Sequence, residues 1–105
     1  MTERRSGKRI PVNIDARFFR GNMFYSGKIL NLSGNSMLIK TNIDMPCGES
    51  FIVLISAKKE LPKLVASVKR ITGENSIFPG IGVELTDPPQ QYTDFVENLF
   101  SYQYL

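Results

Sequence analysis

Ile10-Pro-Val-Asn-Ile-Asp-Ala-Arg-Phe18 alternates apolar side chains with polar ones or proline along its whole length. This period of two is typical of a β-strand with one buried face. Arg20-Gly-Asn22 follows directly, and because glycine and asparagine both tolerate a positive φ, it predicts a tight hairpin turn. Met23 to Leu30 is then expected to return as the second strand.

Four further short apolar segments, separated by turn residues, extend this pattern along the chain. They run from Met37 to Thr41, from Phe51 to Ile55, from Leu64 to Thr72 and from Ile81 to Leu85. The breaks between them carry Gly, Pro or Asn, which favour turns. Six short strands joined in this way predict an all-β fold, a small six-stranded antiparallel β-barrel.

The hydrophobic period changes after Asp87-Pro-Pro89, where helical spacing begins. Spacings of three, four and seven residues relate five apolar side chains, Tyr92, Phe95, Val96, Leu99 and Phe100. This pattern predicts a C-terminal α-helix over 89–101 with one apolar face, and prolines favour its start. We expect the helix to close the open mouth of the barrel.

A chain of 105 residues supports one domain. We expect it to consist of a basic arm over 1–9, a barrel over 10–87 and the helix.

Composition is that of an ordinary soluble globular domain, with 42% hydrophobic and 22% charged residues. The first nine residues are charged and no apolar stretch follows them, so a secretory signal is not expected. The longest apolar run, Phe51 to Ile55, is far too short to cross a bilayer. Cys47 is the single cysteine, which fits a reducing compartment. We therefore expect a cytoplasmic protein without a transmembrane segment.

Catalytic and metal-binding patterns are lacking in the sequence. It contains no histidine, the commonest general base and metal ligand. Cys47 lies in a Pro-Cys-Gly turn without a histidine partner, so a passive role is favoured over a nucleophile. Glu84 is interpreted as part of a strand's polar face, and no carboxylates have metal-binding spacing. We expect a protein that is not an enzyme and that needs neither metal nor cofactor.

Positive charge is concentrated at the start of the chain. The net charge is +3, and residues 1–9 carry all of it, through Arg4, Arg5, Lys8 and Arg9 against Glu3. Residues 10–105 hold nine basic and nine acidic side chains. A general DNA- or RNA-binding protein usually spreads its basic residues over one face of the fold. A short arm that closes over one small anionic ligand fits this distribution better.

Two short motifs resemble the two-part signature of the PilZ domain family. Arg5-Ser-Gly-Lys-Arg9 has two arginines separated by three residues, and Asn31-Leu-Ser33 begins the second motif as the family does, with Asp or Asn, any residue and Ser. The resemblance extends from about Glu3 to about Phe100. It implies a PilZ-type barrel and binding of the bacterial second messenger cyclic di-GMP.

The chemistry of these side chains matches a cyclic guanine dinucleotide. Arginine forks suit guanine O6 and N7 and the phosphates, whereas guanine N1–H and N2–H need acceptors such as an amide oxygen or a hydroxyl. The resemblance implies that Arg5 and Arg9 bind the Hoogsteen edge and phosphate, and that Asn31 and Ser33 face the other edge of the base.

Further positions take roles by the same resemblance. Arg4, just before the first motif arginine, implies that cyclic di-GMP is bound as an intercalated dimer. A residue near the end of the fifth strand, Lys69 or Arg70, is expected to stack on the ligand. Lys8 and Gly34 lie within the two motifs and are secondary candidates.

Ser36 is a candidate ligand contact, and it stands where the family signature has glycine. If that glycine supplies a positive φ, a serine there costs roughly 1 kcal/mol. If the glycine instead lets the ligand approach the backbone, the serine side chain weakens binding. Gly34 and Asn35 are conformationally permissive neighbours, so we expect reduced affinity rather than loss of binding.

Three classes of function remain open from the sequence. The first is a cyclic di-GMP receptor whose arginine arm orders on binding and so signals to a protein effector in motility, biofilm or pilus control. The second is a degenerate PilZ-fold interaction module that binds no nucleotide. The third is a binder of single-stranded nucleic acid, which needs exposed aromatics among basic residues. The aromatics fall largely on predicted core positions, so the receptor is favoured and the third class ranks last.

Overall fold

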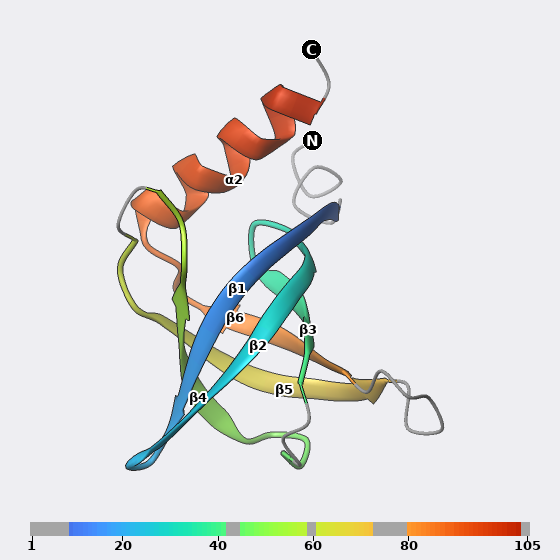
Figure 1. Ribbon diagram of the computed structural model, residues 1–105, viewed down its shortest axis with the longest axis vertical. Helices are drawn as coiled ribbons and strands as arrows, with labels where there is room; N and C mark the ends of the chain where they lie inside the picture. Colours follow the sequence, from blue (N-terminus) through green and yellow to red (C-terminus); the bar gives the residue numbers. More distant parts are fainter. Residues whose placement is uncertain (1–8, 42–44, 59–60, 73–79, 104–105) are drawn as a thin grey trace.

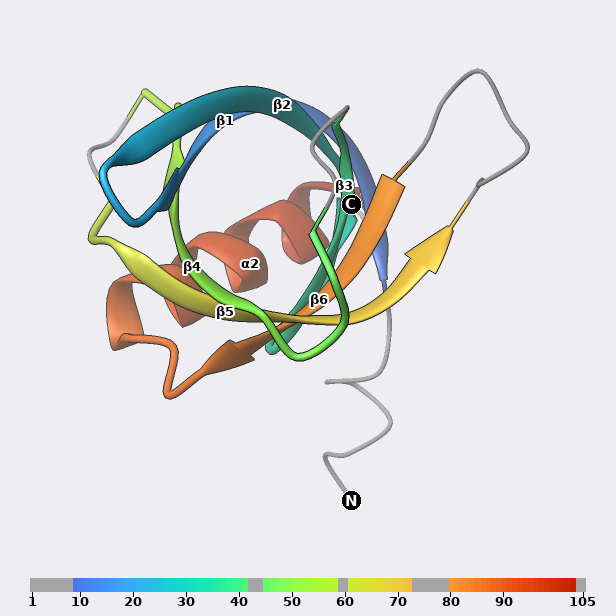
Figure 2. The ribbon, with the colours of Figure 1, turned by 90° about the horizontal axis from the view of Figure 1, so that it is seen from below.

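The computed structural model describes residues 9–41, 45–58, 61–72 and 80–103. Its elements are β1 (Ile10–Arg20), β2 (Met23–Leu32), β3 (Ser36–Lys40), β4 (Ser50–Ile55), β5 (Leu64–Thr72), β6 (Gly80–Thr86) and α2 (Gln90–Gln103). Neighbouring strands are antiparallel, and the sheet closes on itself in the order β1-β2-β3-β6-β5-β4 (Figure 1, Figure 2). The predicted fold class, a six-stranded antiparallel barrel with a C-terminal helix, is confirmed.

A two-residue turn joins β1 to β2. Arg20 pairs with Met23 across it, and Gly21 at its first central position has a φ of 64°. A positive φ at this position alone is the pattern of a type II′ turn, whose twist matches that of the flanking strands. Both residues were expected to tolerate a positive φ, but Asn22 does not adopt one, and only Gly21 does.

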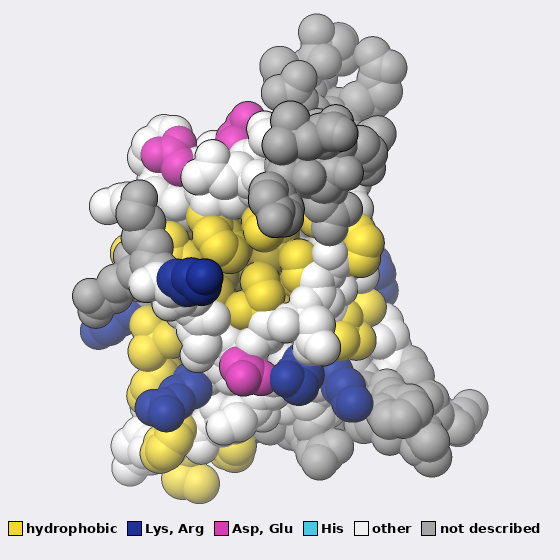
Figure 3. Space-filling view, turned by 45° about the horizontal axis from the view of Figure 1, so that its top comes forward, with side chains coloured by type: hydrophobic (Ala, Val, Ile, Leu, Met, Phe, Trp, Pro, Cys, Tyr) yellow, Lys and Arg dark blue, Asp and Glu magenta, His cyan; other side chains and the backbone are white. Residues whose placement is uncertain are grey.

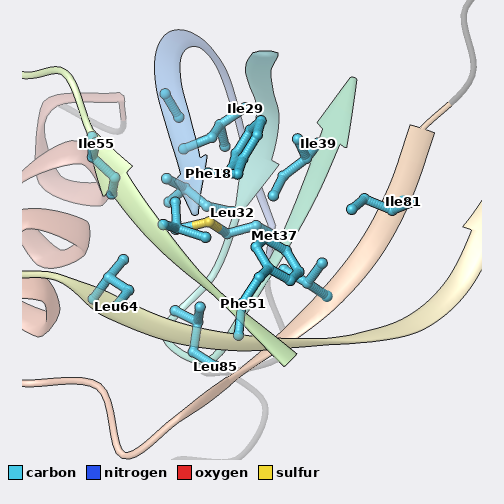
Figure 4. Packing of buried hydrophobic residues seen from close by; sticks show 14 of the residues in the cluster. Phe18, Ile29, Leu32, Met37, Ile39, Phe51, Ile55, Leu64, Ile81 and Leu85 are labelled. Atoms are coloured by element: carbon cyan, nitrogen blue, oxygen red, sulfur yellow. The ribbon is translucent and has the colours of Figure 1, made fainter. Parts of the chain in front are cut away.

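The barrel interior is packed with apolar side chains from all six strands (Figure 4). Phe18 of β1 and Phe51 of β4 meet edge to face, with ring centroids 6.0 Å apart and ring planes at 83°. The alternation predicted for β1 is present, since Ala16 and Phe18 are buried while Arg17 between them is exposed. Because a shift of one residue would bring charged side chains into the core, this pattern fixes the register of the strand.

Helix α2 lies across one end of the barrel (Figure 1, Figure 2). Its Tyr92 is fully buried, and Phe95, Val96 and Leu99 are partly buried against the core. Hydrophobic side chains gather on the face of the molecule where the helix meets the strands (Figure 3). The predicted apolar face of the helix therefore does close the barrel, although the side chain of Phe100 lies outside the described part.

The chain passes from β6 to α2 through Asp87 and two prolines. Asp87 has a φ of 46°, a left-handed conformation that aspartate tolerates better than most residues. The amides of Tyr92 and Thr93 then donate to the carbonyl of Pro89 at 3.0 and 3.2 Å, which forms the first turn. The helix therefore runs over 90–103, close to the predicted 89–101.

Among the described residues, no helix has the length and apolar character needed to cross a membrane.

Candidate functional site

A β-bulge in β5 turns two neighbouring cationic side chains to the outside of the barrel. Val68 pairs with Val83 of β6, but the next paired residue is Arg70, opposite Gly82, which leaves Lys69 as the extra residue. Strict alternation would point Arg70 inward like the buried Val68. The bulge breaks the alternation, and both Lys69 and Arg70 are exposed. The sequence offered these two as alternatives, and the structure brings both to one surface.

Gly82 gives Arg70 room to lie along β6. A Cβ atom at this glycine would lie 3.0 Å from Cγ and 3.2 Å from Nε of Arg70, closer than ordinary side-chain packing allows. The arginine side chain therefore lies against the bare backbone of β6. A Cβ atom at position 82 would require the arginine side chain to shift by a few tenths of an ångström.

Lys69, Arg70 and Gly82 border an open surface depression of about 370 Å³. Its lining comes from the start of β1, the turn before β3, and strands β5 and β6: Arg9, Asn35, Ser36, Lys69, Arg70, Gly82, Val83 and Glu84. Three of these side chains are cationic and one is anionic. The depression therefore favours a negatively charged ligand.

Glu84 and Lys69 form an ion pair inside this depression. The Lys69 Nζ lies 3.1 Å from the Glu84 Oε1, and both side chains are about half exposed. Solvent screens such a pair, so it contributes little to the stability of the barrel. Its effect on this surface is instead to offset one of the three cations.

The two signature motifs meet at Arg9 and Asn31. The Arg9 Nη1 donates a hydrogen bond of 3.2 Å to the Asn31 Oδ1, across 22 positions of sequence. Arg9 also lines the depression, whereas Asn31 does not. The other basic candidates of the first motif, Arg4, Arg5 and Lys8, lie outside the described residues.

The second motif folds into a turn that is bonded to itself. The Ser33 amide donates to the Ser36 carbonyl at 2.8 Å, and the two hydroxyl oxygens are 2.7 Å apart. The Ser33 hydroxyl also donates to the Asn35 Oδ1 at 3.2 Å. Ser33 is only 1% exposed, so its hydroxyl forms hydrogen bonds within the turn on the buried side. Asn35 and Ser36 line the depression. A Cβ atom at Gly34, the secondary candidate that follows Ser33, would meet no other atom within 4 Å.

Ser36 carries no backbone strain. In the described part of the chain, a positive φ occurs only at Gly21, Gly48 and Asp87. The condition under which serine would cost roughly 1 kcal/mol at this position is therefore not met. Ser36 is instead the first residue of β3, opposite Glu84 of β6.

Helix α2 is bonded to the same turn. The buried Tyr92 hydroxyl donates to the Ser33 carbonyl at 2.6 Å, and burial raises the pKa of this hydroxyl above its ordinary value. On the other side of the turn, the Leu85 amide donates to the Asn35 carbonyl at 2.8 Å. The turn is thus held between α2 and β6, which fixes where Asn35 and Ser36 present their side chains.

Four lining residues were not predicted as site residues from the sequence, namely Asn35, Gly82, Val83 and Glu84. Asn35 lies inside the second motif, at a position where the family signature allows any residue. Its proximity to the motif residues was the only feature of the sequence that could have indicated a place in the site. Glu84 fits the prediction of a strand's polar face, but its place beside Lys69 depends on how β6 pairs with β5. The ligand contacts predicted for Arg9, Asn31, Ser33, Ser36 and Arg70 stay predictions.

Known structures share this fold. Bacillus subtilis MotI (DgrA), an inhibitor of motility, matches with a TM-score of 0.75 at 14% identity, over 91% of this chain and 49% of its own. PlzA of Borreliella burgdorferi, solved in complex with c-di-GMP, matches with 0.69 at 14% identity, over 98% and 54%. MrkH of K. pneumonia, also solved with c-di-GMP, matches with 0.65 at 10% identity, over 89% and 49%. This chain thus spans about half the length of each.

A comparison with curated proteins finds no match. The family model described as "PilZ domain" matches residues 3–101. This match takes in both signature motifs, all six strands and nearly the whole helix, so the chain belongs to the PilZ domain family.

Proposed function

We propose that this protein is a receptor for cyclic di-GMP, acting as an adaptor and not as an enzyme. The observation that carries the proposal is the contact between Arg9 and Asn31, which joins the two signature motifs beside a depression lined by three cations. A cyclic guanine dinucleotide brings two phosphates and two guanine edges, and arginine forks bind both kinds of group. PlzA and MrkH, which share the fold, were solved with this ligand, and this supports the same ligand class here.

In this proposal the arginine arm closes over the ligand. Arg5 and Arg9 bind guanine O6 and N7 or phosphate, Asn31 and Ser33 face the other edge of a guanine base, and Arg4 favours an intercalated pair of ligands. Ordering of residues 1–9 changes the surface beside β1 and thereby selects a protein effector. The proposal places this receptor in the bacterial cytoplasm.

Isothermal titration calorimetry tests ligand binding. Cyclic di-GMP is titrated into the wild type, into Arg5→Ala/Arg9→Ala, and into Lys58→Ala/Lys63→Ala, which removes the same charge from exposed positions that do not line the depression. We expect saturable binding by the wild type and the lysine variant, and its loss in the arginine variant. A ratio above one ligand per chain supports the role of Arg4. Absence of heat and of a thermal shift in the wild type would overturn the proposal.

NMR spectroscopy tests the arm. Amide signals of residues 1–9 are followed during a titration with cyclic di-GMP, and we expect their relaxation to change to that of the barrel as the ligand binds. Unchanged arm dynamics at saturating ligand would contradict the ordering step while leaving ligand binding intact.

A second candidate is an interaction module of the same fold that binds no nucleotide. The observation that favours it is the tip of the β1–β2 hairpin, where Met23 and Phe24 are 56% and 60% exposed and Phe24 stacks on Phe19 with ring centroids 5.9 Å apart. Exposed apolar groups of this kind are often protein contacts. This candidate predicts no heat with the dinucleotide and no effect of Arg5→Ala on binding of a protein partner.

A further inference from the structure

A site for guanine must offer hydrogen-bond acceptors as well as arginine forks. The edge that carries N1–H and N2–H presents two donors side by side. The signature assigns this edge to Asn31 and Ser33, but neither residue lines the depression. The Asn31 Oδ1 already accepts from Arg9, and the Ser33 hydroxyl is buried within the turn. The Asn31 Oδ1 keeps a second lone pair for a ligand, but a cyclic dinucleotide carries two guanines, so an acceptor that lines the depression itself would serve the other base.

Three residues that line the depression carry side-chain acceptors, namely Asn35, Ser36 and Glu84. The Asn35 Oδ1 accepts from Ser33, and the Ser36 hydroxyl shares a hydrogen bond with Ser33. Glu84 differs from both, because its carboxylate is the single anionic group among the described residues of this lining and is half exposed. Two oxygens in one plane match two adjacent N–H donors.

The surroundings of Glu84 keep this carboxylate in place. It lies opposite Ser36 of β3 and Ser67 of β5, so it stands in a row across three paired strands. The Lys69 Nζ contacts one oxygen, Oε1, at 3.1 Å, and no other described side chain forms an ion pair with this carboxylate. Lys69 thus occupies one acceptor site of Oε1, and because each carboxylate oxygen can accept more than one hydrogen bond, both oxygens remain available to a ligand.

We propose that Glu84 is a specificity-determining residue that reads the N1–H and N2–H edge of guanine, a role that rests on the proposed cyclic di-GMP function. Adenine has a bare N1 acceptor and an N6 donor at this edge, so a carboxylate would meet a lone pair there. Hypoxanthine keeps N1–H but lacks the N2 amino group. A site that accepts from N2–H therefore discriminates against both bases, because its acceptor is left unpaired when the donor is missing.

A simpler electrostatic role for Glu84 predicts the opposite sign. If Glu84 only offsets the charge of Lys69, its removal adds a free cation to the depression and strengthens binding of any dianionic dinucleotide. Recognition of the base instead predicts weaker binding of the guanine ligand when Glu84 is removed, with a smaller effect on the hypoxanthine ligand. The ratio of the two affinities separates the two roles.

The test is calorimetric titration of cyclic di-GMP, cyclic di-IMP and cyclic di-AMP into the wild type, Glu84→Ala and Glu84→Gln. Ser67→Ala is the matched control, since Ser67 is the cross-strand neighbour of Glu84 but does not line the depression. We expect the wild type to bind cyclic di-GMP about tenfold more tightly than cyclic di-IMP, the size of one charge-assisted hydrogen bond. Cyclic di-AMP should bind more weakly still.

Glu84→Ala should bind cyclic di-GMP about tenfold more weakly and lose most of the preference over cyclic di-IMP, with Ser67→Ala unchanged. Glu84→Gln, which keeps the shape of the side chain and one acceptor oxygen, should fall between the two. Equal or tighter binding of cyclic di-GMP by Glu84→Ala, or an unchanged preference, would overturn the role of Glu84 while the receptor function stands. A wild type that binds none of the three dinucleotides would overturn both.

Discussion

The hydroxyl of Tyr92 in α2 donates a 2.6 Å hydrogen bond to the backbone carbonyl of Ser33, 59 positions earlier in the chain. Both residues are buried, at 0% and 1% exposure. The bond joins the helix that closes the barrel to the turn of the second signature motif. A side chain of the helix therefore helps to fix the turn whose outer residues, Asn35 and Ser36, line the depression.

Replacement of Tyr92 by phenylalanine should destabilise the fold. It leaves the buried Ser33 carbonyl without its partner, at a cost of about 1–3 kcal/mol. We expect Tm to fall by roughly 4–8 °C for each kcal/mol lost in a domain of this size. Tyr25→Phe is the control, because it removes the same hydroxyl from a tyrosine that is only partly buried against the core. Equal Tm values for the two variants would contradict a stabilising role of the bond.

Stability should also fall at alkaline pH through Tyr92. Burial raises the pKa of its hydroxyl, whereas in the unfolded chain the pKa is about 10. Above about pH 10 the unfolded state loses this proton and the folded state keeps it, so the contribution of this group decreases as the pH rises. Urea unfolding at several pH values should show the stability gap between wild type and Tyr92→Phe shrinking above about pH 10. A constant gap would contradict the retained proton.

The fold was predictable from the sequence because its signals are local. The alternation around Phe18, the glycine of the first turn and the spacing of apolar residues after Pro89 each specify one element through nearby residues. Closure of the barrel follows from six such strands with turns between them. The ends of α2 differed slightly from the prediction because sequence period alone defines boundaries less sharply than it defines the element.

The site was less predictable because its geometry depends on pairing between distant strands. The bulge at Lys69 exists only relative to β6, so the sequence left a choice between Lys69 and Arg70. The ion pair between Glu84 and Lys69 depends on the same strand pairing. No residue near Glu84 in the sequence indicates that this ion pair forms. The hydrogen bond from Tyr92 to the Ser33 carbonyl likewise joins residues 59 positions apart. The motifs predict which residues gather, but the tertiary structure decides which of them face the depression.

Replacement of Ser36 by glycine, the residue of the family signature, should lower stability. Ser36 does not need a positive φ, and its hydroxyl lies 2.7 Å from that of Ser33. Glycine would remove this hydrogen bond and increase the backbone entropy of the unfolded chain, for a combined cost of about 1–2 kcal/mol. Thermal unfolding measures the change, and Ser36→Ala separates the hydrogen bond from the backbone entropy. A Ser36→Gly variant more stable than wild type would indicate strain at this residue.

Gly82 should act on ligand binding only through Arg70. A Cβ atom at position 82 would lie 3.0 Å from the Arg70 Cγ, so Gly82→Ala requires the exposed arginine to shift by a few tenths of an ångström. We expect Gly82→Ala to weaken binding of cyclic di-GMP by less than Arg70→Ala does, and the double variant to be no weaker than Arg70→Ala, which is a non-additive cycle. Calorimetry measures all four proteins, and thermal unfolding checks that each is folded. If Gly82→Ala weakens binding further once Arg70 is absent, the glycine contacts the ligand itself, and β6 rather than the arginine forms the floor of the site.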